Sequence, residues 1–201
     1  MNNSVCIFGG SFDPVHKGHK RLADFICERL SPEKMLIIPA AMSPFKNSSG
    51  ATEEDRLNMC ELAFPEKQFE ISDIEIKRGG KSYTVDTVSA VKGLFPDKKL
   101  YLIIGSDQLL SFNKWYRFAD ILSFVTLVSV SREGSVSFSL LEEFAQRELR
   151  PFGEVEILDF SPLEISSTAL REKIASGEDT SQFLDEAVRE YIDRKGLYKN
   201  V

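Results

Sequence analysis

Residues 5–19 read VCIFGGSFDPVHKGH, and the order of residue types in this stretch predicts the architecture around it. An apolar run leads directly into Gly9 and Gly10, and an Asp-Pro turn then precedes residues 16–19. Glycine has no Cβ atom, so it lets a ligand approach the backbone closely and permits backbone shapes barred to other residues. We therefore expect a strand, a ligand-binding loop and a helix that begins near residues 16–19, with its N-terminus suited to phosphate.

Short apolar runs alternate with longer amphipathic segments along the rest of the chain. Several runs are continuously apolar, which is typical of strands covered on both faces of a parallel sheet. This alternation predicts the α/β class with a doubly wound parallel sheet, whose ligands bind at the carboxyl ends of the strands. We expect strands at Val5–Phe8, Met35–Ile38, Phe69–Ile76, Leu100–Ile104, Phe124–Val130 and Val155–Leu158. We expect helices at Lys17–Leu30, Glu53–Phe64, Val85–Leu94, Leu140–Glu148, Ser167–Ala175 and Gln182–Arg194.

The length of 201 residues suits a single domain, 1–201. Within it we expect residues from about 160 to 201 to form a small C-terminal helical subregion, whose last helix ends at Gly196. Residues 43–50 and 131–139 are the most loop-like segments, and we interpret the first as a loop beside a binding site.

The composition argues against several classes of protein. The formal net charge is -6, whereas a general nucleic-acid binder carries a basic face, so we expect no nucleic-acid partner. The N-terminus lacks the basic and apolar regions of a signal peptide, and no apolar stretch approaches the ~20 residues that span a bilayer. The three cysteines show no C-x-x-C spacing, so we expect buried, reduced thiols. These features predict a cytoplasmic protein with no membrane partner.

His16 and His19 are the only histidines of the chain, and their spacing of three places them on one face of a helix. Imidazole can donate a hydrogen bond to a phosphate oxygen. A purely structural pair is the alternative, but the neighbouring glycines and the strand–turn–helix setting favour phosphate binding. We expect no metal ligation, because no third ligand lies nearby. The segment matches neither the Walker A pattern nor G-x-G-x-x-G.

The segment 165–171, ISSTALR, places three hydroxyl residues before a helical run. Such residues commonly cap helices, so capping by Ser166 or Ser167 is an alternative to a ligand role. Arg171 lies four residues after Ser167, hence on the same helix face. Hydroxyls, N–H groups and a guanidinium directed at one point would form an anion site.

In this order and about 150 residues apart, H-x-G-H and ISSTxxR resemble the paired signatures of the nucleotidylyltransferase superfamily, which is related to class I aminoacyl-tRNA synthetases. The resemblance implies a Rossmann-like nucleotidylyltransferase fold, with His16, His19 and Arg171 as catalytic residues at the ATP phosphates. It also implies an ATP-binding set of glycines, hydroxyl residues, an aspartate and a loop lysine: Gly9, Gly10, Ser11, Phe12, Lys46, Gly105, Ser106, Asp107, Ile165, Ser166, Ser167 and Thr168.

Three further segments are similar to bacterial nicotinate mononucleotide adenylyltransferases: residues 39–46, the SYTVDT of 82–87, and the GSDQ of 105–108 followed by Trp115. The resemblance implies that AMP passes from ATP to nicotinate mononucleotide, giving deamido-NAD and pyrophosphate, with Mg²⁺ bound mainly through the ATP phosphates. For nicotinate mononucleotide it implicates Ser11, Thr84, Trp115, Tyr116 and Arg132.

Some of these residues also have a purely structural interpretation. Trp115 offers a flat face for a pyridine ring, but it could also be a core aromatic, and Asp107 could be a helix cap. Residues 132–134 read R-E-G where the family often has R-P-G, which leaves the role of Arg132 open.

Three other functions stay open as alternatives. A pantetheine-phosphate adenylyltransferase shares H-x-G-H but does not account for SYTVDT or Trp115. A non-catalytic nucleotide sensor could keep the phosphate loops, although it would not need His16, His19 and Arg171. A tRNA-handling protein is disfavoured by the acidic charge and the lack of an anticodon-binding region. The preference for nicotinate over nicotinamide, the oligomeric state (including a homo-oligomer) and any loop closure around Lys46 are not readable from the sequence.

Overall fold

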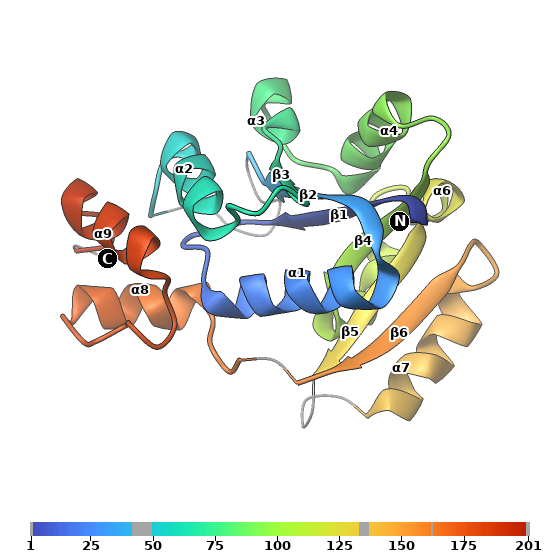
Figure 1. Cartoon of the computed structure of the whole chain (residues 1–201). Helices are drawn as coiled ribbons and strands as arrows, with labels where there is room; N and C mark the ends of the chain where they lie inside the picture. Colours follow the sequence, from blue (N-terminus) through green and yellow to red (C-terminus); the bar gives the residue numbers. More distant parts are fainter. Residues whose placement is uncertain (1, 42–49, 133–136, 162, 200–201) are drawn as a thin grey trace.

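The fold is a six-stranded parallel sheet with helices on both faces (Figure 1). The computed structural model describes residues 2–41, 50–132, 137–161 and 163–199. The strand order is β3-β2-β1-β4-β5-β6, which confirms the doubly wound α/β fold that the sequence predicts. The strands are β1 (Asn2–Gly10), β2 (Pro32–Pro39), β3 (Phe69–Ile71), β4 (Lys99–Gly105), β5 (Thr126–Arg132) and β6 (Val155–Phe160).

The helices alternate with these strands along the chain. They are α1 (Lys17–Leu30), α2 (Glu53–Ala63), α3 (Ile74–Arg78), α4 (Thr84–Leu94), α5 (Ser106–Leu109), α6 (Phe118–Phe124), α7 (Phe138–Phe144), α8 (Ser167–Ala175) and α9 (Glu186–Lys195). A short 3₁₀ helix, η1 (Phe112–Lys114), precedes α6, and a π-helical turn, η2 (Ala145–Leu149), continues α7. Helices α8 and α9 gather at one end of the molecule, drawn in orange and red in Figure 1.

The sheet separates two hydrophobic cores. Successive side chains of a strand point to opposite faces, and in β1 Cys6 and Phe8 belong to one core while Val5 and Ile7 belong to the other. Helices α1, α2, α8 and α9 contribute to the first core, and α4, α6 and α7 contribute to the second. Leu170 and Val188 are buried in the same core as Phe8, which supports the hypothesis that residues 160–201 belong to one domain with the sheet.

The two central strands define where a ligand can enter. The chain runs outward from β1 to β2 and β3, returns to β4 beside β1, and then runs outward to β5 and β6. Phe8 of β1 pairs with Ile103 of β4, so Gly10 and Gly105 end neighbouring parallel strands. The connections leave these two strand ends toward opposite sides, and such a reversal of strand order opens a crevice at the carboxyl edge of the sheet.

Several predicted boundaries are wrong for local physical reasons. The predicted strand Phe69–Ile76 ends at Ile71, and helix α3 begins at Ile74, because the buried carboxylate of Glu75 accepts a hydrogen bond of 2.6 Å from the hydroxyl of Thr87. The predicted helix Leu140–Glu148 begins earlier, at Phe138, because the hydroxyl of Ser137 caps it by accepting from the Leu140 N–H.

The last helix and the fifth strand also begin later than predicted. Helix α9 begins at Glu186 rather than Gln182, because a turn closed on the Thr180 carbonyl precedes it, and it ends at Gly196 in the left-handed conformation, as expected. Helix α6 takes up Phe124, so β5 begins at Thr126. The short helices between β4 and β5 were not predicted, because none is long enough to show a helical period.

The cysteines behave as small apolar residues. All three are free thiols; Cys6 and Cys60 are buried and Cys27 is partly so. Burial raises the pKa of the Cys6 and Cys60 thiols, and burial together with the charge of Asp24 raises the pKa of Cys27 to about 11. The protonated thiol, which is less reactive than the thiolate, is therefore favoured at neutral pH. Within the described ranges, every helix is too short or too polar to cross a lipid bilayer.

Two glycines give opposite predictions for one substitution. At Gly153 an added Cβ would lie 2.4 Å from the carbonyl oxygen of Leu122, whereas at the exposed Gly93 in α4 no described atom lies within 4 Å. We expect Gly153→Ala to lower the free energy of unfolding by about 1–3 kcal/mol and Gly93→Ala to raise it by about 0.5–1 kcal/mol, because alanine favours the helix. Urea unfolding of the two variants measures both; changes of the same sign would contradict this account of the packing.

Candidate active site

The two histidines form a stacked pair at the start of α1. Their ring centroids lie 3.7 Å apart with an interplanar angle of 27°. The spacing of three predicted that both histidines lie on the helix. Only His19 does so, because His16 is the N-cap residue and has an extended backbone. The His19 N–H donates to Nδ1 of His16 and the His16 N–H donates to Nδ1 of His19, at 3.3 Å and 3.2 Å. Because both Nδ1 atoms accept, each neutral ring carries its proton on Nε2, which becomes the donor.

Gly18 explains the middle of the H-x-G-H pattern, although it was not among the predicted site residues. A Cβ atom at this position would lie 2.9 Å from Nδ1 of His16 and 3.0 Å from its Cε1. Any side chain would therefore push the His16 ring away from its partner. Gly18 is required by the close approach of the ring, and the signal for it lay within the motif itself.

Gly9 and Gly10 do not have the special backbone shape that the sequence suggested. They end β1, paired with Ile38 and Pro39 of β2, and neither has a positive φ. The left-handed conformation falls on Phe12 instead, with φ of 48°. Its side chain is 1% exposed and its ring packs edge-on against His19, with centroids 5.0 Å apart. Phe12 therefore supports His19 from the core, and its buried ring leaves only its main chain for a polar ligand.

Asp13 joins the two predicted phosphate motifs. Nη1 of Arg171 donates to the Asp13 carbonyl at 2.7 Å and lies 3.9 Å from its carboxylate Oδ2. The hydroxyl of Ser167 donates to the carbonyl of Pro14 at 3.0 Å. These bonds bring Arg171 and Ser167 onto the loop that precedes His16, as the resemblance implied.

The hydroxyl residues at the start of α8 divide their roles. Ser166 accepts from the Ala169 N–H at 3.1 Å, so the capping alternative holds for Ser166 and not for Ser167. Thr168 accepts from Nη2 of Arg171 at 3.3 Å. Ile165 is partly buried against the first core, which leaves only its main chain suited to a polar ligand.

The carboxylate of Asp13 has two further partners that no sequence pattern indicated. Oδ1 accepts from the hydroxyl of Tyr198 at 2.7 Å, and Oδ2 accepts from the Gly50 N–H at 2.9 Å. Burial, together with the charge of Asp13 and the hydrogen bond to it, raises the pKa of the Tyr198 hydroxyl. The phenol therefore stays protonated and remains a donor to Asp13.

Arg56 supports the same loop from α2. Its guanidinium is 3% exposed, donates through Nη1 to the Ser11 carbonyl at 2.9 Å and through Nη2 to the Ala41 carbonyl at 3.5 Å. Its Nε is buried and has no hydrogen-bond partner among the described residues. A buried cation held only by main-chain oxygens fixes the backbone of two strand-end loops. No local pattern indicated these contacts of Arg56, because an arginine in a charged helix is ordinarily exposed.

At the end of β4, Gly105 caps the short helix α5, with Ser106 buried and Asp107 exposed. The capping alternative for Asp107 is therefore wrong: no side chain caps α5, and the Gly105 N–H donates to Gln108 Oε1 instead. Because β4 is adjacent to β1, these residues lie at the same edge of the sheet as Gly9 and Gly10.

Three of the residues predicted for the acceptor nucleotide, Thr84, Trp115 and Tyr116, lie near the start of α4 and the turn after η1, whereas Ser11 lies on the loop after β1. Thr84 is the first residue of α4, and the ring of the preceding Tyr83 lies 4.9 Å from that of Tyr116. Trp115 packs against the buried Phe112, with ring centroids 4.8 Å apart, and is only partly buried. Trp115 is thus partly a core aromatic, while Tyr116 is exposed.

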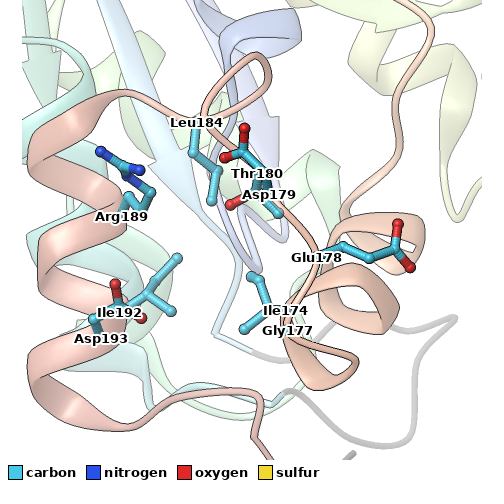
Figure 2. A pocket seen from close by; sticks show the side chains of 9 residues that line it. All are labelled: Ile174, Gly177, Glu178, Asp179, Thr180, Leu184, Arg189, Ile192 and Asp193. Atoms are coloured by element: carbon cyan, nitrogen blue, oxygen red, sulfur yellow. The ribbon is translucent and has the colours of Figure 1, made fainter.

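Two predicted residues are not placed. Lys46 lies outside the described residues, and the side chain of Arg132 does so as well, although its backbone ends β5. A separate cavity of about 250 Å³ lies between α8 and α9 (Figure 2), but none of the predicted residues lines it. Its carboxylates Glu178 and Asp179 already accept hydrogen bonds from Lys173, Ser176 and Ser181. Among the described residues, no three His, Cys, Asp or Glu side chains cluster in the manner of a metal site.

The candidate site therefore combines the loop after β1, which Arg56 and Arg171 contact, with the histidine pair at the start of α1 and with the end of the neighbouring strand β4. Imidazole and guanidinium groups beside a strand-end loop suit an anionic ligand. The profile of the cytidylyltransferase-like family matches residues 7–173. A probable nicotinate-nucleotide adenylyltransferase from Clostridium tetani is 37% identical over 195 residues, covering 96% of this chain and 98% of that protein. One from Geobacillus thermodenitrificans is 37% identical over 196 residues, covering 96% and 85%.

The fold has a solved counterpart. The nicotinic acid mononucleotide adenylyltransferase of Plasmodium falciparum complexed with NaAD superposes with a TM-score of 0.80 at 18% identity, covering 98% of this chain and 97% of that one. The fold and the sequence matches together define a nucleotidyltransferase enzyme of the cytidylyltransferase-like family. Within it the chain belongs to the nicotinate-nucleotide adenylyltransferases, nucleotide-binding transferases of NAD biosynthesis, and this confirms the resemblance seen in the sequence.

The buried guanidinium of Arg56 gives a test of how the loop is held. Lysine cannot bridge the Ser11 and Ala41 carbonyls, so we expect Arg56→Lys to lower the melting temperature and to weaken ATP binding about tenfold. Arg150 is the matched control, because it also donates to a main-chain carbonyl, that of Val155, on the opposite face of the sheet. Arg150→Lys should lower stability and leave ATP affinity unchanged. Calorimetric titration with ATP compares the two; equal losses of affinity would refute a specific role for Arg56.

Proposed function

We propose that the chain transfers AMP from ATP to nicotinate mononucleotide, forming deamido-NAD and pyrophosphate. The observation that carries this proposal is the stacked His16–His19 pair, whose Nδ1 atoms both accept main-chain hydrogen bonds, next to a loop that Arg171 also contacts. Two imidazole Nε2 donors and a guanidinium beside a strand-end loop suit the charge that develops on transferring phosphates.

The reaction needs no protein nucleophile. A phosphate oxygen of nicotinate mononucleotide attacks the α-phosphorus of ATP, a new P–O bond forms, and the bond from the α-phosphorus to the bridging oxygen breaks. Pyrophosphate leaves with that bonding pair. His16, His19 and Arg171 stabilise the negative charge in this step, and the rest of catalysis is the alignment of the two substrates.

The residues proposed to bind ATP come from four segments of the sequence. Ser11 and Phe12 would offer their main chain in the loop that Arg56 and Arg171 hold through the carbonyls of Ser11 and Asp13. The other members are Gly9, Gly10, Lys46, Gly105, Ser106, Asp107, Ile165, Ser166, Ser167 and Thr168. Their support is the shared sheet edge of β1 and β4 and the bond from Ser167 to Pro14.

The acceptor part rests on the aromatic group beside α4. The pyridine ring of nicotinate mononucleotide would stack on Trp115, which is backed by Phe112. The first N–H groups of a helix have no partner within the helix, so the N–H of Thr84 suits the nicotinate carboxylate. Tyr116, Ser11 and Arg132 complete the proposed contacts.

We propose Mg²⁺ as the divalent ion, held chiefly by the nucleotide. The groups at the phosphate site are imidazole and guanidinium donors, which fit phosphate oxygens, whereas Mg²⁺ prefers oxygen ligands. The nearest carboxylate, Asp13, already accepts from Tyr198 and Gly50. When bound, the ion would neutralise phosphate charge.

We also propose a cytoplasmic location, where ATP is available as the adenylyl donor.

His19→Ala tests the histidine pair. Removing one preorganised donor of this kind costs on the order of 10²-fold, so we expect kcat/KM to fall by at least that factor. His19→Gln should recover part of the loss, because its amide nitrogen can reach close to the position of Nε2. The measurement is pyrophosphate release under saturating acceptor, with a melting curve to confirm folding. A folded His19→Ala enzyme with a near-normal rate would refute the assignment.

The acceptor and the metal are tested together. With ATP and Mg²⁺ we expect pyrophosphate release with nicotinate mononucleotide, a slower rate with its amide, and none with phosphopantetheine. EDTA should abolish the reaction and added Mg²⁺ should restore it. Release with phosphopantetheine alone would favour the other adenylyltransferase, and ATP binding without turnover on any acceptor would favour a non-catalytic sensor.

A further inference from the structure

We propose that Tyr198 is a positioning residue for adenylyl transfer: its hydroxyl occupies one oxygen of the Asp13 carboxylate and thereby keeps Arg171 available to the phosphates. This inference rests on the proposed function. Tyr198 follows α9, and its hydroxyl reaches Asp13, 185 positions earlier in the chain, at 2.7 Å. The contact was absent from every sequence pattern.

The first step is the way in which the Asp13 carboxylate is satisfied. Oδ1 accepts from Tyr198 and Oδ2 accepts from the Gly50 N–H at 2.9 Å, so two neutral donors occupy the two oxygens. Without these two donors, the buried Asp13 carboxylate would accept hydrogen bonds from a neighbouring cation instead. That cation is Arg171, whose Nη1 lies 3.9 Å from Oδ2 and 2.7 Å from the Asp13 carbonyl.

The second step concerns the charge on Arg171. Its side chain is 16% exposed, and the distance of 3.9 Å from its Nη1 to Oδ2 of Asp13 is too long for a direct hydrogen bond. A guanidinium paired by two parallel bonds to a carboxylate would be neutralised and turned away from a substrate anion. The donors from Tyr198 and Gly50 therefore prevent Asp13 from competing with phosphate for Arg171.

The third step is that the backbone holds Tyr198 in an uncommon conformation for this contact. Its φ is 63°, in the left-handed region that non-glycine residues seldom adopt. Such a conformation persists only where surrounding contacts fix it. Gly50 packs directly on the ring, since a Cβ there would lie 2.7 Å from Cδ1 of Tyr198 and 3.4 Å from Cδ of Arg171. Tyr198, Gly50 and Arg171 are therefore packed as one unit around Asp13.

The chain contains a matched control. Tyr191 on α9 is also buried, and its hydroxyl donates to the buried carboxylate of Asp55 at 2.8 Å. The Asp55 carboxylate accepts from the N–H and the hydroxyl of Thr52 at the start of α2. Among the described residues its other polar contacts are with Tyr191 and Lys195, not with Arg171 or the loop of Asp13. Tyr198→Phe and Tyr191→Phe thus each delete a buried tyrosine–aspartate hydrogen bond, but only the first lies at the site. Tyr191→Phe also removes the bond that the Tyr191 hydroxyl accepts from Asn58, so it is the more severe change in hydrogen bonding.

The test compares these variants in turnover, in ATP binding and in stability. We expect both to lower the melting temperature, Tyr191→Phe by at least as much as Tyr198→Phe. Tyr198→Phe should lower kcat/KM for ATP about tenfold and weaken Mg-ATP binding in calorimetry, with KM for nicotinate mononucleotide within twofold of the parent. Tyr191→Phe should leave all three constants within twofold. Equal losses of kcat/KM and of ATP affinity in the two variants would overturn the proposal, because they would show a general effect of lost stability.

A double-mutant cycle with Arg171→Gln separates positioning from structure. If Tyr198 acts through Arg171, Tyr198→Phe should change ATP affinity less than twofold in the Arg171→Gln background; a full tenfold loss there would overturn the proposal. If Tyr198→Phe does not fold, Gly50→Ala displaces the ring without removing the hydroxyl, and unchanged ATP affinity in that variant would also overturn it. A parent enzyme that binds ATP but forms no deamido-NAD would refute the proposed function alone, since the binding measurements still decide this inference.

Discussion

The hydrogen bond from Arg171 to the Asp13 carbonyl joins residues 158 positions apart, and the position of α8 against the loop after β1 depends on it. The loop of Asp13 belongs to β1 and α1, at the centre of the sheet, whereas Arg171 belongs to a nine-residue helix at one end of the molecule (Figure 1). A helix of that length is marginal in isolation. Its orientation toward the loop comes from Leu170 in the core and from the bonds to Asp13 and Pro14.

Charge burial adds to this constraint. Asp13 and Arg56 are each 3% exposed; Asp13 belongs to the loop after β1, and Arg56 contacts the Ser11 carbonyl of the same loop. Burying a charge is costly unless hydrogen bonds replace its water, and here they do: Asp13 receives hydrogen bonds from Tyr198 and Gly50, while Arg56 donates to main-chain carbonyls. Such directional bonds give the loop one shape, which a purely apolar core would specify less strictly. The stacked rings of His16 and His19 follow directly after this loop, at the start of α1.

Much of the fold followed from the sequence because its signals are local. The apolar runs alternate with amphipathic helices over most of the chain, and the capping signals of α8 and α9 lie within a few residues of the helix ends. The prediction failed where the decisive contact was distant: Glu75 is drawn into a helix by Thr87, and the region after β4 folds into turns too short to show a period. At the site, the histidines and Gly18 share one motif, whereas Arg56 and Tyr198 come from helical or terminal segments with no local sign of their partners.

The two substrate sites proposed above lie on different parts of this architecture. Phe12, Leu170 and Tyr198, which lie beside the proposed phosphate site, belong to the core on one face of the sheet. Tyr83 and Trp115, beside the proposed acceptor site, pack on the core of the other face. A substitution in the second core can therefore reshape the acceptor pocket without disturbing Asp13 or the histidine pair. Transfer chemistry and acceptor choice are thus structurally separable, which is the physical reason that H-x-G-H alone indicates the reaction class and the aromatic residues must indicate the acceptor.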